Sequence, residues 1–288
     1  MRVLITGAGG MLGRASADAL ASRGHEVAAL PRAELDVLDG NAVTVAIERE
    51  RPQVVLNCAA WTEVDGAETD EQAAMRLNDQ AAAVLAAAAD SAGASIVYPS
   101  SDYVFDGQKT NPYVETDTPA PLSAYGRSKL GGETSVAVAN PRHLIVRSSW
   151  LFGVGGPNFV ETMLRIGAEE QEVVVVTDQV GLPTYTRDLA GGIADLIDAE
   201  QTGIFHVAAT GPCSWYEFAQ EIFDQAGLEC RVMAGTTEML ARPAPRPAFS
   251  VLGSTRRGTP QLPHWRAGLA AYLIEREGPV SEAGEEEG

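Results

Sequence analysis

The chain has 288 residues, of which 45% are hydrophobic, so it is long enough for one large domain or for one domain with a smaller lobe. Its 39 acidic residues outnumber the 21 basic ones, for a net charge of −18. A nucleic-acid surface needs clustered lysine and arginine, so this balance argues against such a partner. No apolar run is long enough to span a bilayer, and the first residues are strand-like, without a secretion signal. We therefore expect no nucleic-acid or membrane partner and a cytoplasmic location.

The first half of the chain alternates short β-branched runs with longer alanine-rich amphipathic runs, which is typical of a parallel sheet covered by helices. Because both faces of such a sheet are buried, its strands read as near-continuous apolar runs. The pattern indicates an α/β fold with a Rossmann-like, doubly wound parallel sheet. Strands are predicted at 2–6, 26–30, 54–57, 95–101 and 143–150, and helices at 11–23, 41–51 and about 75–92.

After Trp150 the alternation becomes less regular. A helix and a strand are predicted within 162–176, then a helix at 189–198, a strand at 203–209, a helix at 214–225, a proline-rich loop at 242–252 and a last helix within 263–277. We assign 1–150 and about 184–225 to a nucleotide-binding domain, and about 151–183 and 226–277 to a smaller C-terminal substrate-binding lobe. The acidic tail, 278–288, has no apolar face and is predicted to be disordered.

The turn after the first strand places Gly7, Gly10 and Gly13 at GxxGxxG spacing, ahead of a helix. A side chain there would keep a pyrophosphate away from the backbone N–H groups, and a helix N-terminus favours an anion. An ordinary tight turn is the alternative, but its place in a βαβ series favours dinucleotide binding. The residues expected around the cofactor are Gly7, Gly10, Met11, Leu12, Gly13, Arg32, Asp36, Val37, Ala59, Ala60, Tyr125 and Lys129.

The end of the second strand bears on which dinucleotide binds. NAD-preferring folds tend to carry an acidic residue there for the ribose 2′-OH, whereas this chain reads ALPRAELD and offers Arg32. An arginine can bind a 2′-phosphate, although a solvated surface arginine is a comparable reading. The sequence favours NADPH and leaves NADH open.

Tyr125 and Lys129 lie four positions apart in the stretch SAYGRSKLGGE. On a helix they share one face, so the ammonium is expected to lower the pKa of the phenol and make Tyr125 a usable proton donor. A solvated helix face is the usual explanation for an isolated pair of this kind. Ser101, however, ends the predicted strand 95–101 at the carboxyl edge, where doubly wound sheets bind ligands. Its hydroxyl could hold a carbonyl oxygen beside the tyrosine.

The glycine turn, the strand-end serine and the YxxxK pair together resemble the extended short-chain dehydrogenase/reductase family. The stretches SSDYVFDG, AYGRSKLGGE, VRSSWLFG, DQVGLPT, WYEFA and RPAPRPAFSVL resemble its dTDP-4-dehydrorhamnose reductase branch, over nearly the whole chain. This resemblance implies that NAD(P)H reduces a 4-keto sugar, with Ser101 orienting the carbonyl, Tyr125 as general acid and Lys129 binding the nicotinamide ribose. It also implies a dTDP-sugar substrate bordered by Ser101, Asp102, Tyr103, Trp150, Asn158, Gln179 and Arg246.

A sugar diphosphate needs a few cations among apolar walls, and the candidates are Arg147, Arg165, Arg187 and Arg246. Some members of the family dimerise around Mg²⁺ held by glutamates, one of them shortly after the glycine turn. This chain has Arg14 and Ala15 in that region, and its cysteines and histidines form no metal-ligand pattern. We therefore expect no metal, and a monomer or a weak homodimer.

Two other functions share part of this pattern. A sugar-nucleotide epimerase or dehydratase has the same turn and YxxxK pair, but a dehydratase usually has a glutamate where this chain has Tyr103, which favours reduction. A non-catalytic subunit resembling the regulatory subunit of methionine adenosyltransferase is the second alternative; retention of Tyr125, Lys129 and a strand-end hydroxyl speaks against it. Trp61, Trp215, Trp265 and His206 are predicted to be packing residues.

Overall fold

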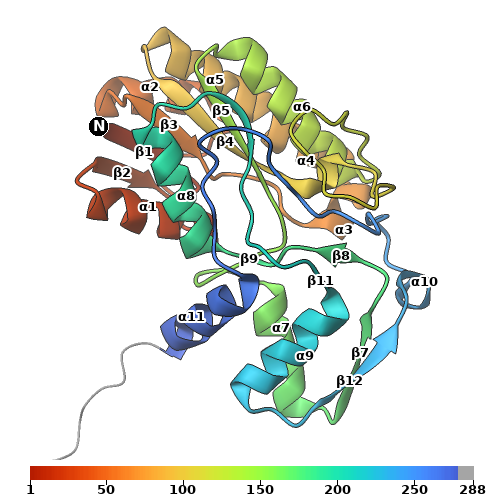
Figure 1. Ribbon diagram of the computed structural model, residues 1–288. Coiled ribbons are helices and arrows are strands. Elements are labelled where there is room, and N and C mark those ends of the chain that lie inside the picture. The colour runs from red at the N-terminus through yellow and green to blue at the C-terminus, as the bar shows by residue number, and fades with distance from the viewer. Residues whose placement is uncertain (278–288) are drawn as a thin grey trace, which may run out of the picture.

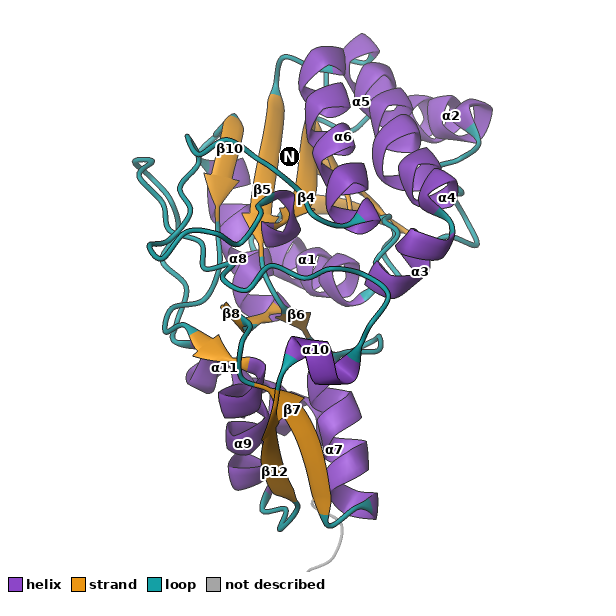
Figure 2. Cartoon of the chain, turned by 90° about the vertical axis from the view of Figure 1, so that its right-hand side faces the viewer, coloured by secondary structure: helices purple, strands orange, loops and turns teal. Residues whose placement is uncertain are grey.

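The computed structural model describes residues 1–277, so the predicted acidic tail lies outside the described residues. One central sheet forms the larger body and a smaller lobe lies beside it (Figures 1 and 2). The strands run in the order β10-β5-β4-β3-β1-β2, and every neighbouring pair is parallel. This confirms the predicted α/β class. The strands are β1 (Arg2–Thr6), β2 (Glu26–Leu30), β3 (Val54–Asn57), β4 (Ser95–Ser101), β5 (His143–Ser148) and β10 (Gly203–His206).

Helices cover both faces of this sheet (Figure 1). Successive side chains of a strand point to opposite faces, so in β1 Val3 and Ile5 pack under one helix layer and Leu4 under the other. The first layer consists of α1 (Met11–Ser22) and α8 (Thr186–Asp198), and the second consists of α2 (Gly40–Glu50), α5 (Ala82–Ser91) and α6 (Ala124–Ala139). The first four strands have the predicted bounds. The fifth ends at Ser148, before Trp150, whose φ is +47°.

The long helix predicted at 75–92 begins earlier and contains a π-helical segment. It consists of α4 (Glu71–Met75), the segment Arg76–Ala81 and α5. Within that segment the carbonyl of the buried Asn78 accepts a hydrogen bond from Tyr98 Oη (2.8 Å), and a Cβ at Gly132 of α6 would collide with the same carbonyl. This close approach fixes the position of α6, the helix that carries Tyr125 and Lys129.

The smaller lobe has its own core. The parallel strands β7 (Glu172–Val176) and β12 (Arg231–Gly235) pair with one another, and Phe152, Phe218 and Trp265 pack in the centre. Its helices are α7 (Phe159–Glu169), α9 (Trp215–Ala226), α10 (Thr237–Leu240) and α11 (Trp265–Glu277), and its short strands are β6 (Leu151–Phe152), β8 (Val180–Gly181), β9 (Thr184–Tyr185) and β11 (Cys213–Ser214).

The packing of α9 differs from the predicted division of the chain. We assigned about 184–225 to the nucleotide-binding domain, and α8 and β10 do join the central sheet. In contrast, α9 buries Phe218, Ile222 and Phe223 in the core of the lobe, against α7, β7 and β12. The apolar stripe of α9 faces the lobe because the chain leaves the central sheet after β10 and enters the lobe at β11. No helix within residues 1–277 is long and apolar enough to cross a membrane.

Candidate active site

The carboxyl ends of β1 and β3 meet where the strand order reverses, because β2 lies on one side of β1 and β3 lies on the other. Gly7 follows β1 with φ +62°, and a Cβ there would lie 2.5 Å from the Ala59 nitrogen. A Cβ at Gly13 would lie 2.6 Å from the Gly7 carbonyl oxygen. The fold itself therefore requires glycine at both positions. Such a reversal point is the usual ligand crevice of a doubly wound sheet.

Gly10 differs from these two glycines. It is the N-cap of α1 with an ordinary φ of −82°, and the nearest atom to a Cβ there would be 3.5 Å away. No side chain of the described residues caps α1, and its first turn has no acidic residue. The uncapped N–H groups at the start of α1 can thus donate hydrogen bonds to an anion, and the pyrophosphate of a dinucleotide suits this turn. Met11 and Leu12 form the start of the helix beside it.

The residues predicted around the rest of the dinucleotide lie near this turn. Ala59 and Ala60 follow β3 and are half-buried, and Arg32 and Asp36 are exposed after β2. The Asp36 carboxylate accepts a hydrogen bond from the Leu38 N–H group (3.0 Å). Val37 is only 3% exposed and packs in the core under α2, so its side chain is not available to a ligand.

Ser101 and Tyr125 come together from β4 and α6. The Ser101 hydroxyl donates to Asp102 Oδ1 (3.0 Å) and accepts from the Tyr103 N–H group (3.1 Å). Ser123 caps α6 through the Gly126 N–H group (3.1 Å), which places Tyr125 in the first turn. The Tyr103 and Tyr125 rings meet edge to face, with centroids 5.8 Å apart. The strand end and the helix start thus hold a hydroxyl and a phenol side by side.

The Tyr125 pKa is not lowered in this structure. Burial raises it to about 12, and a hydrogen bond with Ser101 offsets part of that rise. Lys129 donates instead to the Pro99 carbonyl (2.7 Å), and its Nζ lies 4.3 Å from the Tyr98 ring centroid. The prediction that Lys129 lowers the Tyr125 pKa is therefore wrong, because the ammonium is directed at β4. Tyr125 is protonated at neutral pH, which is the form that a proton donor needs.

Burial also raises the pKa of the neighbouring carboxyl group, Asp102, to about 7. Beyond Tyr103 lies Arg246, whose Nη2 donates to Asp65 Oδ2 (2.9 Å) and whose Nη1 donates to the Ala244 carbonyl (2.9 Å). Asp65 also accepts from the Ala244 N–H group (3.1 Å), so it ties the proline-rich loop to α3 (Val64–Thr69). Sequence reasoning missed Asp65, which has no signal beyond its place shortly after β3.

Three further predicted substrate residues lie in or beside the lobe. Trp150 stacks on Trp215 at 3.6 Å with nearly parallel rings. Asn158 caps α7 through Oδ1, and its Nδ2 donates to the Gly153 carbonyl (3.0 Å). Gln179 is 5% exposed, and its Nε2 donates to Thr237 Oγ1 (2.8 Å). Both amides therefore hold lobe loops in place.

Of the four candidate arginines, one is buried, two lie at the surface and one lies beside the candidate site. Arg147 is 2% exposed and forms a 2.6 Å ion pair with Glu133, so its predicted contact with a diphosphate is wrong. Arg165 pairs with Glu169 at 3.3 Å and Arg187 with Glu275 at 2.7 Å, both at the surface. Arg246 is the candidate that lies beside the Ser101–Tyr125 group. Burial raises the pKa of Tyr103, and the charge of Arg246 offsets part of that rise.

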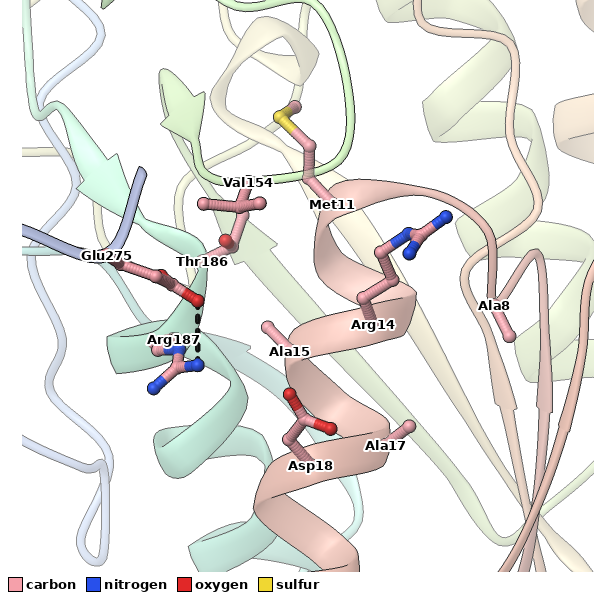
Figure 3. A pocket seen from close by; sticks show the side chains of 10 residues that line it. All are labelled: Ala8, Met11, Arg14, Ala15, Ala17, Asp18, Val154, Thr186, Arg187 and Glu275. Carbon is pink, nitrogen blue, oxygen red and sulfur yellow. Dashed lines mark ion pairs between the residues drawn. The ribbon is translucent and has the colours of Figure 1, made fainter. Parts of the chain in front are cut away.

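A pocket of about 340 Å³ lies along α1, between that helix, the start of α8 and the end of α11 (Figure 3). Ala8 and Met11 connect it to the glycine turn, and the Arg187–Glu275 ion pair forms its far wall. Ser101, Tyr125 and Lys129 do not line it. The pocket is therefore a neighbour of the cofactor turn and not the place where a carbonyl would meet the phenol.

Comparison with known proteins agrees with this geometry. The RmlD substrate binding domain family matches residues 1–277. A dTDP-4-dehydrorhamnose reductase of Streptomyces griseus is 45% identical and covers 93% of this chain and 91% of its own length. The crystal structure of a dTDP-4-dehydrorhamnose reductase from Clostridium acetobutylicum superposes with a TM-score of 0.93 at 43% identity, covering 96% of this chain and 100% of that one.

A second structure, of dTDP-4-dehydrorhamnose reductase from Bacillus anthracis in complex with NADP, has a TM-score of 0.92 at 39% identity and covers 95% of this chain and 99% of that one. The match extends through both the sheet and the lobe. The chain therefore belongs to the RmlD substrate binding domain family.

Proposed function

We propose that this chain reduces the 4-keto group of dTDP-4-dehydro-L-rhamnose, or of a closely related dTDP-4-keto-6-deoxysugar, to the alcohol. The observation that carries the proposal is the meeting of Ser101, at the end of β4, with Tyr125, in the first turn of α6, one helical turn before Lys129. Relatives named as dTDP-4-dehydrorhamnose reductases, at about the same length, support the substrate class.

In this proposal the phenol of Tyr125 donates its proton to the oxygen of the substrate carbonyl as that oxygen gains negative charge. Ser101 holds the same oxygen in place through a hydrogen bond, while Asp102 and Tyr103 border the sugar. Lys129 supplies a buried positive charge under the site. Arg246 binds the diphosphate in exchange for part of its contact with Asp65, and Trp150, Asn158 and Gln179 border the substrate from the lobe.

The reduced nicotinamide of NADPH supplies the hydride. The glycine turn at Gly7, Gly10 and Gly13 accepts its pyrophosphate, with Met11 and Leu12 at the helix start. Arg32 binds the 2′-phosphate, Asp36 and the backbone of Val37 border the adenine, and Ala59 and Ala60 leave room along the strand ends. The NADP complex of the Bacillus anthracis relative supports the choice of NADPH over NADH.

A coupled assay tests this function. The 4-keto-6-deoxy-L-hexose nucleotide is generated in situ, NADPH or NADH is added, absorbance at the nicotinamide band is followed, and the sugar product is identified. We expect stoichiometric consumption of cofactor and faster turnover with NADPH. Turnover without net consumption would indicate an epimerase or dehydratase instead, and the absence of any oxidation above background would favour a binding protein.

We also propose a cytoplasmic enzyme that needs no metal and is a monomer or a weak homodimer. Arg14 and Ala15 line the pocket along α1 together with Asp18 and Glu275, and the Glu275 carboxylate is already paired with Arg187 (2.7 Å). Sedimentation equilibrium with Mg²⁺ and then with a chelator checks this. The expected molar mass is the same in both, and a dimer that dissociates when the metal is removed would contradict the proposal.

A further inference from the structure

A buried charge network continues along α6 beyond Lys129. Glu133 follows Lys129 by one helical turn on the same face, and both residues are 3% exposed. The Glu133 carboxylate accepts hydrogen bonds from Arg147 Nε (2.8 Å), from Arg147 Nη2 (2.6 Å) and from Ser100 Oγ (2.5 Å). Ser100 is the neighbour of Ser101, so one carboxylate holds both the helix and the strand end of the candidate site.

Arg147 cannot leave this arrangement easily. Its Nη1 lies 3.3 Å from His206 Nε2, and its guanidinium lies 5.2 Å from the Phe105 ring centroid. His206 is itself buried and held at Nδ1 by the Tyr113 carbonyl (3.0 Å), as predicted for a packing histidine. Breaking a buried ion pair leaves an uncompensated charge, so this pair is a fixed element of the fold.

Lys129 lies where burial opposes its charge and lowers its pKa to about 8. Cys58 and Tyr98 lie near it on neighbouring elements, and Tyr125 lies one turn earlier on α6 itself. Burial raises the pKa of all three groups, so they are neutral near pH 7. Asp79 acts on Tyr98 from the π-helical segment, and Arg147 adds a second positive charge beyond Glu133. Glu133 is thus the carboxylate that favours the ammonium form of Lys129.

We propose that Glu133 is a positioning residue for Lys129: clamped by Arg147 and Ser100, its carboxylate keeps the lysine charged on the face of α6 that also carries Tyr125. The catalytic meaning of this inference rests on the proposed function, but the state of the lysine can be measured without turnover. Loss of the carboxylate would leave Lys129 and Arg147 as two buried cations, which favours the neutral amine.

The chain offers a direct readout because it contains two lysines, Lys109 and Lys129. With lysine labelled at the ε-carbon, the ¹³C shift of each is followed against pH by NMR, and Lys109→Arg assigns the signals. In the wild type Lys129 is expected to titrate near pH 8. In Glu133→Gln its midpoint should fall by about one pH unit or more, a tenfold loss in the ratio of charged to neutral lysine. The double variant Glu133→Gln/Arg147→Met should fall between the two.

Glu71→Gln is the matched control, since it removes an exposed ion pair (2.7 Å) between Glu71 of α4 and Arg127 of α6, the helix that carries Lys129. It should leave the Lys129 midpoint unchanged. The double variant removes both charges, so it leaves no unpaired arginine and can be used if the single variant fails to fold. If its Lys129 midpoint equals that of the wild type, the inference is overturned. An equal shift in Glu71→Gln would also overturn it. The midpoint is measured even in a chain that oxidises no NADPH, so failure of the proposed function is distinguishable from failure of this inference.

Discussion

Tyr125→Phe is expected to lower kcat of the proposed reductase by about 10²- to 10⁴-fold, the usual contribution of a positioned general acid. The ring remains in contact with Tyr103, and only the hydroxyl beside Ser101 is lost. The affinity for NADPH should therefore change little. Steady-state kinetics on the coupled substrate and a fluorescence titration with NADPH measure the two quantities separately.

Tyr216→Phe is the control for this substitution. Its hydroxyl lies on α9 and accepts a hydrogen bond from Gln220 Nε2 (3.1 Å), so its loss should leave kcat unchanged. Wild-type turnover in Tyr125→Phe would remove the assigned proton donor. The reduction would then need another acid, and Asp102, whose pKa is about 7, would be the first group to test.

The inner strands of the central sheet were predictable because they are buried on both faces. Runs such as VVLN at 54–57 contain no exposed position, so their bounds follow from hydrophobicity alone. In contrast, β12 was missed because its side chains are mostly exposed or half-buried and its apolar pattern is weak. The packing of α9 differs from its predicted place in the nucleotide-binding domain for a related reason: an amphipathic stripe shows that a helix is half-buried but not which core covers it.

Charged residues were harder to place from the sequence. The i and i+4 spacing correctly put Tyr125 and Lys129 on one helix, but it could not show that Pro99 and Tyr98 receive the ammonium. Arg147 reads as a surface cation until Glu133, which is 14 positions away, is seen to neutralise it. Glu133 did carry a signal, because it continues the same four-residue spacing after Lys129. Contacts between separate elements decide such cases, and a single sequence does not contain them.

The three glycines of the turn give a second expected result with a large effect. Gly10→Ala should fold with a stability loss below about 1 kcal/mol, since its backbone angles suit any residue and a Cβ meets no close atom. It should nevertheless weaken NADPH binding about ten- to a hundredfold, because the added methyl disturbs hydrogen bonds from the turn to a charged pyrophosphate. Isothermal titration with NADPH measures the affinity, and chemical denaturation measures the stability.

Two control variants separate a loss of stability from a loss of cofactor binding. Gly13→Ala would place a Cβ 2.6 Å from the Gly7 carbonyl, so it should lose both stability and cofactor binding. Gly24→Ala has open space around it but a φ of +81°, so it should cost about 1 kcal/mol of stability and leave NADPH affinity intact. If Gly10→Ala binds NADPH as tightly as Gly24→Ala does, the pyrophosphate does not lie on this turn. The assignment of the cofactor pyrophosphate to the N-terminus of α1 would then be wrong.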